Sequence, residues 1–89
     1  MDGLLIIDIQ NDFITGSLSI DHSYSIISKI NQIKKQFKIV ILSQDSHPKN
    51  HISFASNNNT EVMSIKQLTF KDIKYDQMMW PDHCVKNSI

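Results

Sequence analysis

Acidic and histidine residues in the second half of the chain have the types and spacing of metal ligands. Asp45 and His47 are two residues apart, so in an extended segment both side chains lie on one face. Zinc, manganese and iron accept this mixture of oxygen and nitrogen donors, although an isolated Asp-x-His is more often a turn-capping acid beside a surface histidine. His83, close to Pro81, would be a third ligand, and His51 is a candidate fourth. Three protein ligands with open positions for water or substrate are typical of a catalytic metal site.

Three other residues could take part in chemistry. Asp8 interrupts an apolar run, where a carboxylate costs several kcal/mol unless it is paired or functional, so we interpret it as functional. Cys84 follows His83 directly, but catalytic cysteine and histidine residues are normally brought together from distant positions, which favours a small buried residue instead. We interpret His22 as a surface or capping residue.

The elements that must position these side chains follow from the hydrophobic pattern. Residues 4–9 and 39–43 are short apolar runs rich in β-branched side chains, typical of strands buried on both faces. Between them, residues 22–37 have apolar side chains at spacings of three and four, which predicts an amphipathic helix. The order predicts a right-handed βαβ unit with parallel strands, so Asp8 and Asp45 could reach a common crevice beyond the carboxyl ends of the strands, where ligands bind.

The rest of the chain has weaker signals. Residues 48–61 read as a loop with turn chemistry, and residues 62–77 show no clean period, although they could supply a short strand. We expect one partial domain over residues 1–89, with the metal ligands in loops 45–54 and 80–85. One helix cannot cover both faces of a parallel sheet, so a partner chain or a longer α/β protein should complete it.

Composition excludes several classes of function. The chain has 89 residues and a formal net charge of +0, which gives no electrostatic reason to expect a nucleic acid or an anionic membrane as partner. A single cysteine cannot form an internal disulfide, and we find neither a secretory signal nor an apolar run long enough to cross a bilayer. We therefore expect a cytoplasmic protein.

Four motifs in this order resemble the nicotinamidases of the isochorismatase-like cysteine hydrolase superfamily. They are LIIDIQNDF at residues 5–13, GSL at 16–18, SQDSHPKNHISFA at 43–55 and WPDHCV at 80–85. The resemblance covers the whole chain. It implies the N-terminal part of a Rossmann-like three-layer α/β/α fold with a parallel sheet. It also implies hydrolysis of nicotinamide to nicotinate and ammonia in NAD salvage, and the sequence does not distinguish nicotinamide from a related amide substrate such as pyrazinamide.

The resemblance also implies roles for individual residues. Asp8 matches the acid of the family's Asp, Lys and Cys triad, which moves the proton of the nucleophilic thiol to the leaving ammonia. The resemblance makes Asp45, His47 and His83 ligands of a divalent ion, for which we expect zinc ahead of manganese or iron, and it gives His51 as a fourth ligand in some relatives. The ion would hold the pyridine nitrogen. Phe13 and Trp80 match aromatic residues that pack on the substrate ring, although core packing explains either equally well.

The chain departs from the family pattern because the matching Lys, nucleophilic Cys and oxyanion hole lie beyond the last motif. Cys84 matches a non-catalytic position, so we expect the 89-residue chain to be inactive alone. Two alternatives stay open: a truncated fragment without catalytic function, and a metal-binding module. The full-length parent could be a homo-oligomer.

Overall fold

The computed structural model describes residues 2–88, which form two compact units that meet in sequence between Ser46 and His47. The sequence shows no sign of this boundary, because the segment lacks the composition of a linker. Within the described residues, none of the helices has the length and hydropathy needed to span a bilayer.

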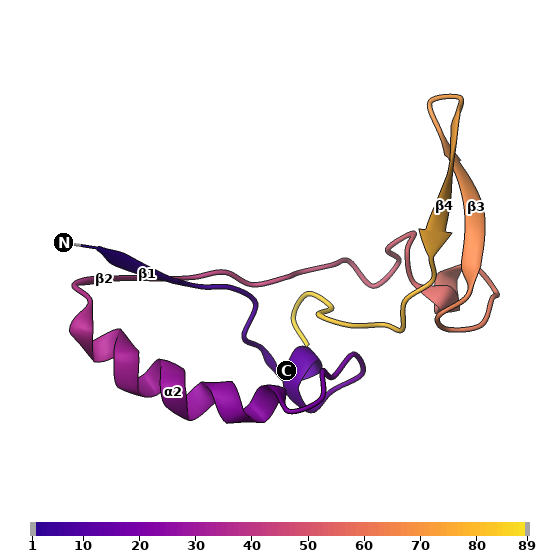
Figure 1. Cartoon of the computed structure of the whole chain (residues 1–89). Helices are drawn as coiled ribbons and strands as arrows, with labels where there is room; N and C mark the ends of the chain where they lie inside the picture. Colours follow the sequence, from indigo (N-terminus) through magenta and orange to yellow (C-terminus); the bar gives the residue numbers. More distant parts are fainter. Residues whose placement is uncertain (1, 89) are drawn as a thin grey trace. The chain divides into compact units, whose positions relative to one another are not determined.

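The first unit contains the βαβ arrangement predicted from the sequence. Strands β1 (Gly3–Ile6) and β2 (Ile39–Leu42) pair in parallel, with Gly3 opposite Ile39 and Ile6 opposite Leu42. The connection between them runs beside the strand pair (Figure 1). Its helical elements are α1 (Asn11–Ile14), η1 (Ser23–Ser25), α2 (Ile26–Ile33) and η2 (Lys34–Gln36).

The element boundaries differ from the expected ones for local backbone reasons. The first strand ends at Ile6 instead of residue 9, and Asp8 adopts a left-handed φ of 54°, which an extended ladder cannot accommodate. The expected helix over residues 22–37 is divided into a 3₁₀ turn, an α-helix and a second 3₁₀ turn. His22 has a φ of 64° and therefore stands outside the helix.

The strand pair is covered on one face only. The face toward α2 includes buried Ile6 and half-buried Val40, and an open apolar groove of about 440 Å³ remains between strands and helix. The opposite face was expected to be buried, but four of its side chains are 57–62% exposed: Leu5, Ile7, Ile39 and Ile41. Residues 2–46 contain no second layer for this face, so its apolar surface remains in contact with solvent.

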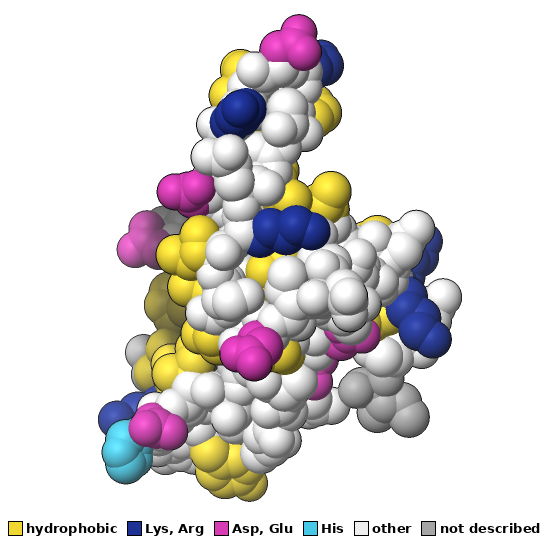
Figure 2. All heavy atoms as spheres, turned by 90° about the vertical axis from the view of Figure 1, so that its right-hand side faces the viewer, with side chains coloured by type: hydrophobic (Ala, Val, Ile, Leu, Met, Phe, Trp, Pro, Cys, Tyr) yellow, Lys and Arg dark blue, Asp and Glu magenta, His cyan; other side chains and the backbone are white. Residues whose placement is uncertain are grey.

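The second unit is built around an antiparallel hairpin that the sequence pattern did not reveal. Strands β3 (Ile65–Phe70) and β4 (Ile73–Met78) pair over six residues each. Lys71 and Asp72, which connect them, both have positive φ values, as a two-residue type I′ turn requires. Lysine and acidic side chains gather at the free end of this hairpin (Figure 2).

A small core anchors the base of the second unit. Phe54 and Met79 are fully buried, and Ala55 and Cys84 are nearly so. The turn η3 (Ala55–Asn57) begins beside this core. The buried state of Cys84 confirms its interpretation as a small buried residue.

Candidate metal centre

The backbone and side chain of Asp8 are both held by Ser43. The Asp8 N–H donates to Ser43 Oγ at 3.0 Å, and the Ser43 hydroxyl donates to Asp8 Oδ1 at 2.7 Å. Asp8 lies just beyond β1 and Ser43 just beyond β2, so the register of the parallel strands brings them together. The left-handed backbone of Asp8 is thus stabilised by the neighbouring strand exit.

Asp45 is held by a second pair of hydrogen bonds between the segments that follow β1 and β2. The Asp45 N–H donates to Gln10 Oε1 at 2.8 Å, and Gln10 Nε2 donates to the Asp45 carbonyl oxygen at 3.1 Å. Asp8 and Asp45 therefore both lie beyond the carboxyl ends of the strands, as the sequence predicts.

Backbone hydrogen bonds place His47 beside the segment that carries His83. The His47 N–H donates to the Cys84 carbonyl oxygen at 2.8 Å, and the Lys86 N–H donates to the His47 carbonyl oxygen at 2.7 Å. His47 and Val85 consequently form an isolated parallel bridge. Two segments that are distant in sequence thus present their imidazole rings to each other, with ring centroids 4.9 Å apart.

The environment of His83 leaves one of its nitrogens suited to binding a metal. The side chain is only 5% exposed, and its Nδ1 lies 2.7 Å from the Pro81 carbonyl oxygen. A carbonyl oxygen can only accept, so in the neutral ring Nδ1 carries the proton and Nε2 carries the lone pair that could bind a metal. Orientation of a histidine ligand by a backbone carbonyl is common at metal sites in proteins.

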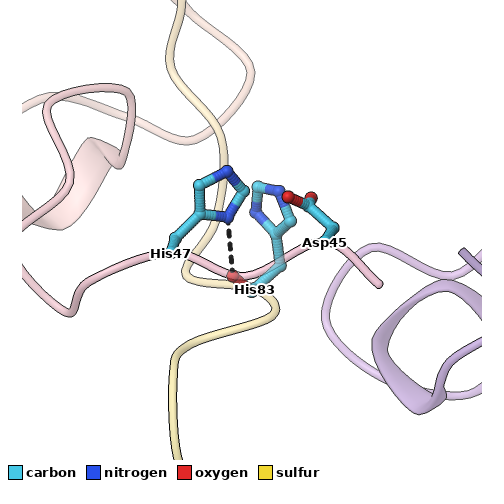
Figure 3. Close-up of side chains that lie close together, drawn as sticks. All are labelled: Asp45, His47 and His83. Carbon is cyan, nitrogen blue, oxygen red and sulfur yellow. Dashed lines mark hydrogen bonds between the residues drawn. The ribbon is translucent and has the colours of Figure 1, made fainter. Parts of the chain in front are cut away.

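Asp45, His47 and His83 form a group whose candidate ligand atoms all lie within 4.8 Å of one another. Their side chains point toward a common point (Figure 3). Asp45 and His47 are half-buried and His83 is buried. One carboxylate and two imidazoles are a donor set that fits a borderline divalent ion, with positions left for water or substrate.

His51 lies next to this group but is not part of it. Its ring is 4.6 Å from the ring of His47, while its Nδ1 accepts the Ser53 N–H at 3.1 Å and lies 2.7 Å from Ser53 Oγ. Because Nδ1 accepts a hydrogen bond, the neutral ring carries its proton on Nε2. In this arrangement His51 packs against a candidate ligand.

The two aromatic candidates occupy different surroundings. Phe13 and Asp8 line the same open pocket of about 510 Å³, whose other walls are mainly isoleucine side chains. Trp80 is half-buried, and its backbone N–H donates to the Ser53 carbonyl oxygen at 2.8 Å. His22 is exposed at the rim of the Phe13 pocket, in agreement with its interpretation as a surface residue.

Sequence reasoning missed Gln10 and Ser43. Gln10 follows Asp8 by two residues, and Ser43 precedes Asp45 by two. Each polar residue therefore lies close in sequence to the acid that follows the same strand. This spacing was the available signal, but each residue binds the acid of the other strand.

Comparisons with known proteins agree with the motifs. The chain is 40% identical to the nicotinamidase of Escherichia coli over 90 residues and 38% identical to that of Acinetobacter baylyi over 87, in each case over 96% of its own length. Against the Saccharomyces cerevisiae nicotinamidase the identity is 31% over 100 residues, covering 99% of the chain. No family model matches the chain.

Solved structures give the same result for the fold. A nicotinamidase and pyrazinamidase from Acinetobacter matches with a TM-score of 0.81 and 36% identity over 97% of the chain. The yeast nicotinamidase matches with a TM-score of 0.82 and 32% identity over 99% of it. The chain spans only 39–46% of the length of these proteins. In sequence and in its incomplete, isochorismatase-like α/β fold, the chain corresponds to the N-terminal two-fifths of the nicotinamidases.

Proposed function

We propose that the chain contributes the metal site and the catalytic acid of a nicotinamidase, which converts nicotinamide and water to nicotinate and ammonia. The Asp45, His47 and His83 group carries this proposal, because it occurs in a chain that aligns with nicotinamidases over almost its whole length. The product nicotinate would enter NAD salvage. The comparisons do not favour a truncated fragment without catalytic function or a separate metal-binding module.

The donor set supports binding of a divalent ion, with zinc ahead of manganese or iron. When bound, the ion would supply a Lewis acid that attracts the pyridine nitrogen of the substrate and orients its carboxamide. The contribution of the chain is to hold the three ligands. The Pro81 carbonyl fixes the tautomer of His83, and burial keeps that ring in place.

Asp8 would act as the general base and then as the general acid. It takes the proton of the attacking thiol and returns it to the leaving ammonia. The bond from the Ser43 hydroxyl leaves the other carboxylate oxygen, Oδ2, as the proton carrier. Phe13, on the same pocket as Asp8, would pack on the flat pyridine ring, and Trp80 is the second candidate for this contact.

The proposal requires a nucleophile that the 89 residues do not provide. Cys84 is the only cysteine, and its side chain is just 6% exposed in the core around Phe54. The exposed apolar face of β1 and β2 is a second sign that further polypeptide participates. We therefore propose that activity needs the region corresponding to the remaining three-fifths of a nicotinamidase.

A complementation assay tests this proposal. The 89-residue chain is mixed with the polypeptide corresponding to the rest of the Acinetobacter baylyi nicotinamidase, and ammonia release from nicotinamide is measured. We expect activity from the mixture and from neither part alone. Asp8→Asn should abolish the activity, whereas Asp76→Asn, which changes an exposed carboxylate on β4, should preserve it.

Two results would contradict the proposal. Ammonia release by the 89-residue chain alone would show that Cys84 or another group is the nucleophile. Equal activity with Asp8→Asn and with the wild-type chain would remove Asp8 from the reaction.

A further inference from the structure

The side-chain amide of Gln10 binds both backbone polar groups, the N–H and the carbonyl oxygen, of the candidate metal ligand Asp45. It accepts from the Asp45 N–H at 2.8 Å and donates to the Asp45 carbonyl oxygen at 3.1 Å. A planar primary amide carries a donor and an acceptor side by side, which matches the two backbone groups of one residue. Gln10 thus pairs with Asp45 as a neighbouring strand would.

This contact lies where the sheet no longer fixes the backbone. The parallel pairing of β1 and β2 ends at Ile6 and Leu42, so Asp45 stands three residues beyond the ladder. A backbone free to rotate at this point would move the carboxylate away from the two histidines. The half-buried Gln10 restrains that rotation from 35 residues away in sequence.

We infer that Gln10 is a positioning residue for the metal site: it fixes the backbone of Asp45 and so orients the carboxylate toward His47 and His83. The inference rests on the metal site of the proposed function. Gln10 needs no contact with the ion, because its effect passes through Asp45. Removal of outer partners of this kind typically lowers metal affinity about 10–100-fold.

Zinc affinity of the full 89-residue chain, measured by isothermal titration calorimetry, tests the inference. Gln10→Met keeps the length of the side chain but removes both hydrogen bonds, and we expect zinc binding to weaken by about 10-fold or more. Gln32→Met makes the same chemical change on the exposed surface of α2 and should leave the affinity unchanged.

A double-mutant cycle separates positioning from a general loss of structure. Asp45→Ala should itself weaken zinc binding, because it removes the carboxylate ligand. In that background Gln10→Met should have almost no further effect, since the carboxylate that it orients is gone. An equal loss in both backgrounds would overturn the inference.

Hydrogen exchange gives a second measurement that needs no metal. The Asp45 amide should exchange slowly in the wild-type chain and faster in Gln10→Met, while the amides of β3 and β4 keep their rates. Rapid exchange of the Asp45 amide in the wild type would contradict the restraint of Asp45 by Gln10. If the wild-type chain binds no zinc, the proposed metal site fails together with the inference. If it binds zinc and Gln10→Met binds equally well, only the inference fails.

Discussion

Ser43→Ala should destabilise the first unit through the loss of its two bonds to Asp8. The substitution removes a neutral bond from the Asp8 N–H and a bond to the Asp8 carboxylate, at 3.0 and 2.7 Å. A neutral hydrogen bond contributes about 1 kcal/mol and one to a charged group about 1.5–3 kcal/mol, and both values fall where water can replace the lost partner. Both bonds lie in exposed surroundings. We therefore expect the free energy of unfolding to fall by about 1–2 kcal/mol.

Thermal unfolding followed by circular dichroism measures this effect. A loss of 1 kcal/mol lowers Tm by about 4–8 °C in a domain of 60–100 residues, so the expected fall is about 4–16 °C. Ser43→Thr keeps the hydroxyl and should retain most of the stability. A Tm for Ser43→Ala equal to that of the wild type would refute the reasoning, as would equal losses for the Ala and Thr variants.

Three further predictions concern the hairpin, the exposed sheet face and the metal. Replacing Lys71 and Asp72 together by Asn-Gly should stabilise the β3–β4 hairpin by about 1 kcal/mol, because both positions have positive φ, and a lower midpoint in urea unfolding would contradict this. Ile41→Ala should weaken binding of the complementing nicotinamidase polypeptide about 5–10-fold, with little change in the stability of the chain itself. Ile41 is 57% exposed, and burial of this exposed part on binding is worth about 1–1.5 kcal/mol. Unchanged affinity in calorimetry would count against this face as the contact. Zinc at 100 times its Kd should raise the free energy of unfolding by about 2.7 kcal/mol, an increase that EDTA reverses and that His83→Gln reduces, as checked by urea unfolding.

The sequence predicted the parts of the fold that depend on strong hydrophobic periods. Two apolar runs and the helical spacing between them sufficed for the parallel β1–β2 pair and its helical crossover. The predicted end of β1 at residue 9 was wrong because Asp8 has a left-handed backbone conformation, which no apolar pattern reveals. The hairpin was missed because its turn is Lys71-Asp72 instead of a glycine-containing pair, and because its strands alternate only weakly between apolar and polar residues.

The candidate site was likewise predicted only in part from the sequence. Residue types and spacing predicted that Asp45, His47 and His83 belong together, and the structure places them together. Gln10 and Ser43 escaped prediction because their partners are set by the register of two strands 35 residues apart, and not by local sequence. His51 is chemically a ligand type, and its ring lies 4.6 Å from that of His47 while the Ser53 N–H donates to its Nδ1; its role as a fourth ligand stays a prediction.

X-ray absorption spectroscopy of the zinc-loaded chain tests the metal site most directly. The account predicts one zinc ion per chain with two imidazole nitrogens and carboxylate or water oxygens in its first coordination shell, at about 2.0–2.2 Å. Asp45→Asn and His83→Gln should each change that shell. A shell with a sulfur ligand, or one without imidazole, would contradict the site formed by Asp45, His47 and His83.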